Sequence, residues 1–380
     1  MKIKYALGLF IVITLCLFAM ELTLRLCGHV PEYQRGGLVN PDVERWTVDP
    51  LLGWRNQPND FVVHDAILPP STVRTDSEGY RNSCNPRPSS DAPLVAFIGD
   101  SITFGAEVDD CYTGPALTGS LIRQELPRIQ IVNAGVRGYS TLQSERMLEE
   151  VLSRHPHVAL VCYTFVWNDF VENIIPNMHS LLAPVAALDG SGELTVREVN
   201  PEEENAILEK AEKKREAYLK AQEKYFREES ALKRFAKSHS VLASDILRVR
   251  YRLAERFRVH ASESEDAANA QLRQAKEQHG VEILTRLLLK MQRVCAAHGC
   301  RLLTAQYTQY NGYDTRYYDF AQICRNLGID YVDISKEFTG APASYLTKKT
   351  DGTYDAHYGY KGNLAFAHAV APMAISMLKR

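Results

Sequence analysis

A serine near residue 100 lies in a sequence context that suits nucleophilic chemistry. The apolar run at 94–98 is followed directly by Gly99, Asp100 and Ser101. A serine at the turn from a strand to a helix exposes its hydroxyl at the edge of a sheet, close to backbone N–H groups that can receive an oxyanion. The tripeptide alone is a weak signal, which a turn serine that caps the next helix would also explain.

Further polar groups follow other apolar runs. Gly135 comes after the run at 129–134, and Asn168 comes after the run at 158–165. Near the carboxyl end, Asp355 and His357 offer a base with a carboxylate two positions away. A nucleophile, two oxyanion donors and an Asp/His pair are the groups that acyl transfer requires. Each also has a simpler interpretation, as a turn glycine, a capping asparagine or a surface histidine.

These residues need elements that bring them together. Five short runs rich in aliphatic and aromatic residues predict strands buried on both faces, at 94–98, 129–134, 158–165, 301–307 and 329–334. Amphipathic patterns predict helices at 113–126, 141–154, 281–298, 315–326 and 361–378. This alternation predicts an α/β fold, with helices on both faces of a five-stranded parallel sheet. Ligands of such sheets bind at the carboxyl ends of the strands, where the chemical groups fall.

One connection in this alternation is far longer than the others. It contains Asn200, Pro201 and Glu203, the cap, first-turn proline and capping-box glutamate of a helix start. We therefore predict a helical insertion at about 180–275 in a main domain that spans 94–380. Its charge-rich helices have either a merely solvated face or a surface for a protein partner. The Pro- and Gly-rich stretch 28–93 predicts a lead-in segment that wraps the main domain.

The amino terminus predicts a membrane anchor. Lys2 and Lys4 precede an uncharged run over 5–20, and apolar residues continue to Leu26. Twenty-two helical residues span about 33 Å, against roughly 30 Å of hydrocarbon. Residues 1–27 are thus expected to form a single-pass transmembrane helix in the cytoplasmic membrane, with the main domain on the periplasmic or extracellular side. A cleaved signal peptide and a buried soluble helix are the alternatives.

Composition and cysteine usage exclude several classes. The 380 residues are 45% apolar and 24% charged, as in ordinary globular proteins, and the net charge of −2 gives no attraction for nucleic acid. The cysteines are too sparse for a disulfide scaffold, and their spacing resembles no zinc site. Cys295 and Cys300 straddle a helix end, where they either pair or remain free thiols. No metal or organic cofactor is implied.

Taken together, four blocks resemble the SGNH (GDSL-like) hydrolase family. They are Gly99-Asp100-Ser101-Ile102-Thr103-Phe104-Gly105, Asn133-Ala134-Gly135, Asn168-Asp169 and Asp355-Ala356-His357, in that order between the expected elements. The G-x-S-x-G pattern of ordinary α/β-hydrolases is absent. The resemblance covers about 94–170 and 301–380. It implies a flavodoxin-like three-layer sandwich with a five-stranded parallel sheet.

The resemblance also implies roles for particular residues. Ser101 would be the nucleophile, His357 the base and Asp355 the group that orients it, while the N–H groups of Ser101 and Gly135 and the side-chain amide of Asn168 would form the oxyanion hole. Two departures affect the substrate pocket rather than the reacting atoms. Val166 replaces the glycine usual before the asparagine block, and Tyr358-Gly359 replaces the Pro-Asn that commonly follows the histidine.

The expected activity is that of a serine esterase or acylhydrolase acting on an ester-bearing glycan, lipid or small molecule, with O-acetyl groups among the candidates. An O-acyltransferase that modifies a cell-envelope polysaccharide would use the same residues. A non-catalytic envelope protein on a hydrolase scaffold is the third hypothesis, and it would have no need of the complete set of catalytic groups.

Overall fold

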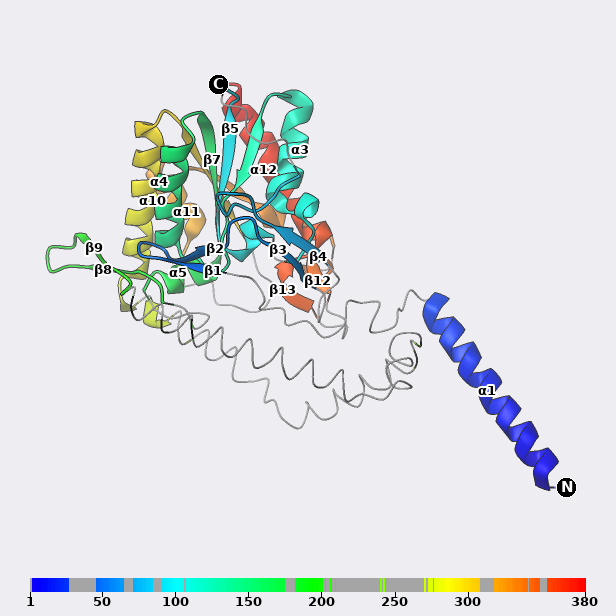
Figure 1. The fold of residues 1–380 in the computed structure, drawn as a ribbon. Coiled ribbons are helices and arrows are strands. Elements are labelled where there is room, and N and C mark those ends of the chain that lie inside the picture. The colour runs from blue at the N-terminus through cyan, green and yellow to red at the C-terminus, as the bar shows by residue number, and fades with distance from the viewer. Residues whose placement is uncertain are drawn as a thin grey trace.

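The computed structural model describes most of the chain except the long insertion. It describes residues 2–26, 46–64, 71–84, 91–105, 107–174, 182–200, 273–275, 277–307, 318–340, 342–348 and 354–380, with single positions at 202, 206, 209, 240, 242 and 270. The central element is a five-stranded sheet with the order β11-β10-β7-β5-β6, in which every pair is parallel (Figure 1). Its strands are β5 (Leu94–Gly99), β6 (Gln130–Asn133), β7 (Val158–Phe165), β10 (Arg301–Gln306) and β11 (Asp330–Asp333). The predicted five-stranded parallel sheet is confirmed.

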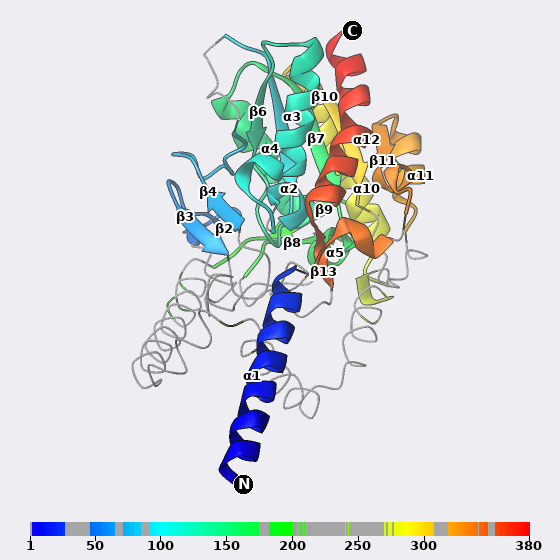
Figure 2. The same ribbon diagram turned by 90° about the vertical axis from the view of Figure 1, so that its right-hand side faces the viewer.

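Helices cover both faces of this sheet, as Figures 1 and 2 show. Helices α3 (Gly114–Glu125) and α12 (Tyr360–Leu378) lie on one face, and α4 (Thr141–Arg154), α10 (Gly280–Ala297) and α11 (Phe320–Leu327) lie on the other. The helices form one hydrophobic core on each face of the sheet, and alternate residues of β5 pack in these two cores. Ala96 and Ile98 pack in the core beneath α4 and α10, whereas Val95 and Phe97 pack in the core beneath α3 and α12. Burial on both faces explains why the strand is apolar throughout.

The helices begin where their sequences supply caps. Ser140 accepts a hydrogen bond from Gln143 N–H, and the Gln143 side chain accepts one from Ser140 N–H, so this capping box fixes the start of α4. Thr113 caps α3 through its side chain alone, by accepting from Ala116 N–H at 3.2 Å. At the other end of the chain, Asn363 of α12 accepts from Gly114 N–H at 2.8 Å, which ties α12 to α3.

The lead-in segment contributes two antiparallel strand pairs that the sequence did not predict. They are β1 (Trp46–Asp49) with β2 (Gly53–Asn56), and β3 (Phe61–His64) with β4 (Ser71–Arg74). Trp54 is 1% exposed, and its indole N–H donates to the carbonyl of Arg137 at 3.1 Å. Arg81 N–H donates to the carbonyl of Asn133, the last residue of β6, at 2.9 Å. The segment therefore packs against the edge of the sheet near the carboxyl ends of its strands.

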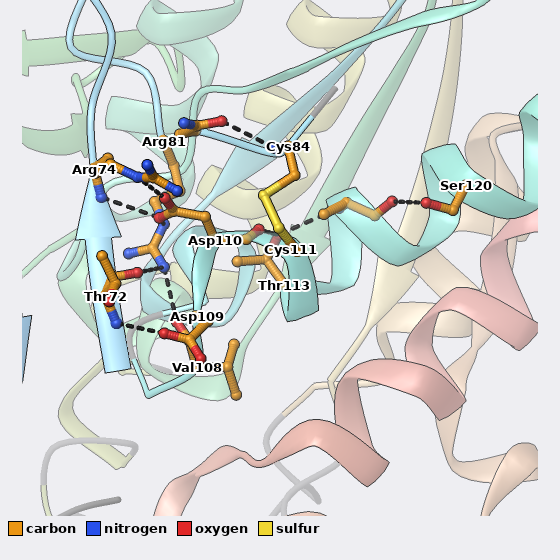
Figure 3. Close-up of a disulfide and its surroundings, with 12 residues drawn as sticks. Thr72, Arg74, Arg81, Cys84, Val108, Asp109, Asp110, Cys111, Thr113 and Ser120 are labelled. Atoms are coloured by element: carbon orange, nitrogen blue, oxygen red, sulfur yellow. Dashed lines mark hydrogen bonds and ion pairs between the residues drawn. A yellow bond between two sulfur atoms is a disulfide. The ribbon is translucent and has the colours of Figure 1, made fainter. Parts of the chain in front are cut away.

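A disulfide fastens the lead-in to the main domain (Figure 3). Cys84 is bonded to Cys111, and the guanidinium of Arg81 pairs with Asp110 at 3.1 Å beside it, with both charged side chains buried. Cys295 and Cys300, for which the sequence allowed either a disulfide or free thiols, are buried free thiols. The actual pairing links segments that become neighbours only after folding, so cysteine spacing along the chain could not reveal it.

The insertion is described only in part. Strands β8 (Val185–Leu188) and β9 (Leu194–Arg197) form a β-hairpin, although helices alone were predicted for 180–275. Asn200 accepts from Glu202 N–H at 3.0 Å, as expected of a helix cap. The predicted helices of the insertion and their partner surface lie almost entirely outside the described residues.

The amino terminus forms helix α1 (Lys2–Leu26), in which Glu21 and Arg25 pair at 2.9 Å as their spacing predicts. Among the residues that the structure describes, no helix has the length and apolar character needed to cross a membrane. The predicted transmembrane helix is therefore not supported.

Candidate active site

Ser101 is the first residue of a one-turn helix, α2 (Ser101–Phe104), that directly follows β5. Asp100, not Ser101, caps this helix, by accepting from Ile102 N–H at 2.9 Å. Gly99 has a φ of +146°, and a Cβ there would lie 2.9 Å from the carbonyl oxygen of Thr164 on β7. Only glycine allows this close turn. The turn leaves the Ser101 hydroxyl partly exposed, as the sequence context predicts.

The structure brings His357 to this hydroxyl. His357 lies on β13 (Tyr354–Tyr358), which pairs with β12 (Leu346–Lys348) and leads into α12. Its Nε2 is 2.9 Å from Ser101 Oγ, across 256 positions of sequence. Asn363 fixes the end of this strand by donating to the carbonyl of Tyr358 at 3.1 Å. The serine and the histidine thus meet at the carboxyl edge of the sheet.

The carboxylate seen beside the histidine is not the one that the sequence suggested. Glu107 Oε1 lies 3.5 Å from His357 Nδ1, and the Glu107 side chain is 3% exposed. The backbone of Asp355 lies on β13, but its side chain is outside the described part of the chain, so its orienting role stays a prediction. Glu107 follows the serine block by two residues, and that proximity was the only sequence signal for it.

Two of the three predicted oxyanion donors, Gly135 and Asn168, lie beside α2, each with an acceptor already in place. Gly135 N–H donates to Asn133 Oδ1 at 3.1 Å. Asn168, on α5 (Trp167–Glu172), donates through Nδ2 to Glu172 at 3.1 Å and to Asp100 at 3.5 Å. The second of these contacts is long for a hydrogen bond and therefore weak.

Three buried carboxyl groups surround Asn168. Burial raises the pKa of Asp100, and burial followed by the charge of Asp100 raises the pKa of Asp169 well above its ordinary value. Burial and the same charge raise the pKa of Glu172 to about 8. Asp169 has a structural role, because it accepts from Tyr163 OH at 2.7 Å and from Val166 N–H at 3.2 Å, which fixes the start of α5. Sequence reasoning did not identify Asp100 or Glu172 as part of the site.

This arrangement can perform nucleophilic chemistry. When His357 carries its proton on Nδ1, the unprotonated Nε2 accepts from the Ser101 hydroxyl, and the Nδ1–H faces Glu107. The same hydroxyl is 3.4 Å from Asp100, a weaker acceptor than the histidine at that distance. A hydroxyl that donates to a neutral imidazole is an activated nucleophile.

Fold and site together define an α/β protein with a serine–histidine pair at the carboxyl edge of a parallel sheet. Among solved structures, TesA is similar at 13% identity over 75% of this chain and 99% of its own, with a TM-score of 0.40. A GDSL-like lipase from Bacteroides thetaiotaomicron is similar at 12% identity over 78% of this chain and 93% of its own, with a TM-score of 0.34. No family model matches the chain, and no curated protein is significantly similar to it.

Proposed function

We propose that this chain is a serine esterase or acylhydrolase of the SGNH type, which cleaves an ester through an acyl-enzyme on Ser101. The contact of 2.9 Å between Ser101 Oγ and His357 Nε2, at the edge where parallel sheets bind ligands, carries the proposal. The four sequence blocks that resemble the SGNH family support it independently.

The proposed reaction has two proton transfers in each half. Ser101 Oγ attacks the ester carbonyl while its proton moves to His357 Nε2. Collapse of the tetrahedral intermediate breaks the bond to the alcohol, which leaves with that proton, and Ser101 keeps the acyl group. Water then attacks the acyl-enzyme, gives a proton to His357 and releases the acid as Ser101 regains its hydrogen. The electron pairs and protons balance without any further reactant.

The oxyanion in this proposal takes its hydrogen bonds from three groups near α2. The backbone N–H of Ser101 is one, and Gly135 N–H and the Asn168 amide are the others. Asn168 can turn one N–H toward the oxyanion by giving up only its contact of 3.5 Å with Asp100, while its bond of 3.1 Å to Glu172 holds the amide in place. Gly135 N–H would give up its hydrogen bond to Asn133 Oδ1 and donate to the substrate oxygen instead.

Transfer of the acyl group to a sugar hydroxyl, instead of water, would use the same residues. An ester panel that varies acyl length and alcohol separates these activities and defines the substrate. We expect the purified protein to release acid from short activated esters, above the rate of a heat-denatured sample. Transfer products that form only when a glycan is added would favour the acyltransferase. A complete lack of turnover and of transfer across the panel would favour the non-catalytic hypothesis.

We further propose that the catalytic domain works outside the cytoplasm, attached to the cytoplasmic membrane by its amino terminus. The Cys84–Cys111 disulfide supports an oxidising location, and Lys2 and Lys4 before the apolar run support export. A carboxyl-terminal reporter that is active only in the cytoplasm should be silent, whereas a reporter active only after export should give signal. The opposite pattern would exclude export. A mature chain beginning beyond residue 19 would show cleavage in place of anchoring.

A further inference from the structure

Glu107 is a buried carboxylate that meets the catalytic pair from a part of the chain with no assigned function. It lies between α2 and the 3-10 turn η2 (Asp110–Tyr112), six positions after Ser101. Its Oε1 is 3.5 Å from His357 Nδ1, on the side of the imidazole that faces away from Ser101. The two ring nitrogens of His357 thus face a hydroxyl on one side and a carboxylate on the other.

Burial of a carboxylate is costly unless positive or hydrogen-bonding groups compensate for it. Arg137 supplies such a group, because its Nη2 is 4.0 Å from the same Oε1 of Glu107. The carbonyl of Arg137 in turn accepts from the indole N–H of buried Trp54, a residue of the lead-in. Arg137 therefore places a positive charge within 4.0 Å of the carboxylate that faces the imidazole.

The loop that carries Glu107 is also held in place by residues of the lead-in. Arg81 Nη2 donates to the carbonyl of Val108 at 2.8 Å, and Arg81 Nε pairs with Asp110 at 3.1 Å (Figure 3). The Cys84–Cys111 disulfide adds a covalent link beside this pair. The lead-in thus restrains the residues immediately after Glu107, and a restrained loop presents its carboxylate in a constant position.

We infer that Glu107 is a positioning residue, which holds His357 with Nε2 toward Ser101 and stabilises the imidazolium that forms during acyl transfer. This inference rests on the proposed function. It gives the lead-in a role in catalysis, because Arg81 and the disulfide restrain the loop of Glu107, and Trp54 binds the backbone of Arg137. Whatever Asp355 contributes from β13, Glu107 approaches the same imidazole from a different element.

The experiment compares Glu107→Gln with wild type for kcat, KM and the pH profile of kcat/KM on an activated ester. We expect kcat to fall by about 10²-fold with KM nearly unchanged, because the carboxylate acts on the base and not on the substrate. The acid limb of the profile should move to lower pH, since the negative charge that favours a protonated imidazole is removed. Asp100 also faces His357, and Asp355 shares its strand, so Asp355→Asn is measured in parallel.

The matched control is Glu78→Gln. Glu78 Oε2 lies 3.2 Å from His155 Nε2, so this variant also removes a carboxylate from a histidine. His155 follows α4 and lies at the opposite edge of the sheet, near the start of β7, away from Ser101. Glu78→Gln should keep the wild-type kcat and pH profile. A loss of thermal stability in Glu107→Gln without any change in kcat or in the acid limb would overturn the inference.

Two further variants make every result decisive. If Glu107→Gln gives no folded protein, Glu107→Asp keeps the charge and withdraws it by one methylene. A reduced kcat with an unmoved acid limb then supports the inference, and a wild-type kcat rejects it. Ser101→Ala sets the background rate. If Ser101→Ala is as active as wild type, the proposed function fails. If it is inactive while Glu107→Gln behaves as wild type, only the role of Glu107 fails.

Discussion

Replacement of Ser101 by alanine should lower kcat on activated esters by at least ~10³-fold and abolish labelling by a fluorophosphonate probe. Ser101 Oγ, 2.9 Å from His357 Nε2, is the atom that would carry the acyl group. A water molecule in its place could not form this covalent intermediate. The substitution removes one oxygen at a partly exposed position, so circular dichroism and melting temperature should remain close to wild type.

Labelling and turnover must be lost together for the assignment to hold. Ser120 is a suitable control, because its hydroxyl donates to the carbonyl of Ala116 within α3, away from the catalytic edge. Ser120→Ala should label and turn over as wild type does. Undiminished labelling of Ser101→Ala would mean that another residue is the nucleophile.

Replacement of Glu172 by glutamine should reduce the loss of stability that the protein undergoes as pH rises from 6 to 8. Burial and the charge of Asp100 raise the Glu172 pKa from its ordinary value of 4.5 to about 8. The folded state therefore binds a proton that the unfolded chain releases, so this contribution to stability is complete below about pH 4.5 and is lost as pH rises through 8. Between pH 6 and pH 8 the free energy of unfolding should fall by about 2 kcal/mol from this group alone.

Urea unfolding of wild type and Glu172→Gln at pH 6, 7 and 8 measures this effect. Glutamine keeps an oxygen that can accept from Asn168 but cannot ionise, so the variant should lose less stability over this interval. Asp100 and Asp169 also have raised pKa values and are present in both proteins, and because the Glu172 charge helps to raise the pKa of Asp169, the variant should lose part of that pH dependence as well. Glu282→Gln, at an exposed position of α10, should follow wild type. Parallel pH dependence in wild type and Glu172→Gln would contradict the prediction.

The sheet and its helices were predictable because their sequences carry simple physical patterns. The apolar run at 158–165 coincides with β7, and the amphipathic pattern at 141–154 coincides with α4, whose capping box marks its start. Strands buried on both faces consist almost entirely of apolar residues, so they can be recognised in the sequence as short apolar runs. The serine, glycine, asparagine and histidine blocks were found because each one directly follows or precedes such an element.

The features that were missed depend on contacts between distant segments. Glu107 has an unremarkable sequence context, and only the folded chain shows that it reaches a histidine 250 positions away. The strands of the lead-in are four residues long, too short for a periodic pattern to distinguish them from loops. Of the acceptors that Asn168 and Gly135 use, only Asp100 is distant in sequence, 68 positions from Asn168, whereas Glu172 and Asn133 lie four and two positions from their donors.

The attachment of His357 to α12 has a consequence for the order of events during folding. The turn that presents Ser101 is built from residues close to it in sequence, such as Gly99 and Asp100. The histidine arrives only when α12 docks on α3 through the bond between Asn363 and Gly114, which are 249 positions apart. Contacts between such distant positions require a large loop to close. The chain entropy lost on closing that loop opposes the contacts until they have formed. Regain of catalytic activity therefore reports the docking of α12, and not the earlier assembly of the strand and turn that hold the nucleophile.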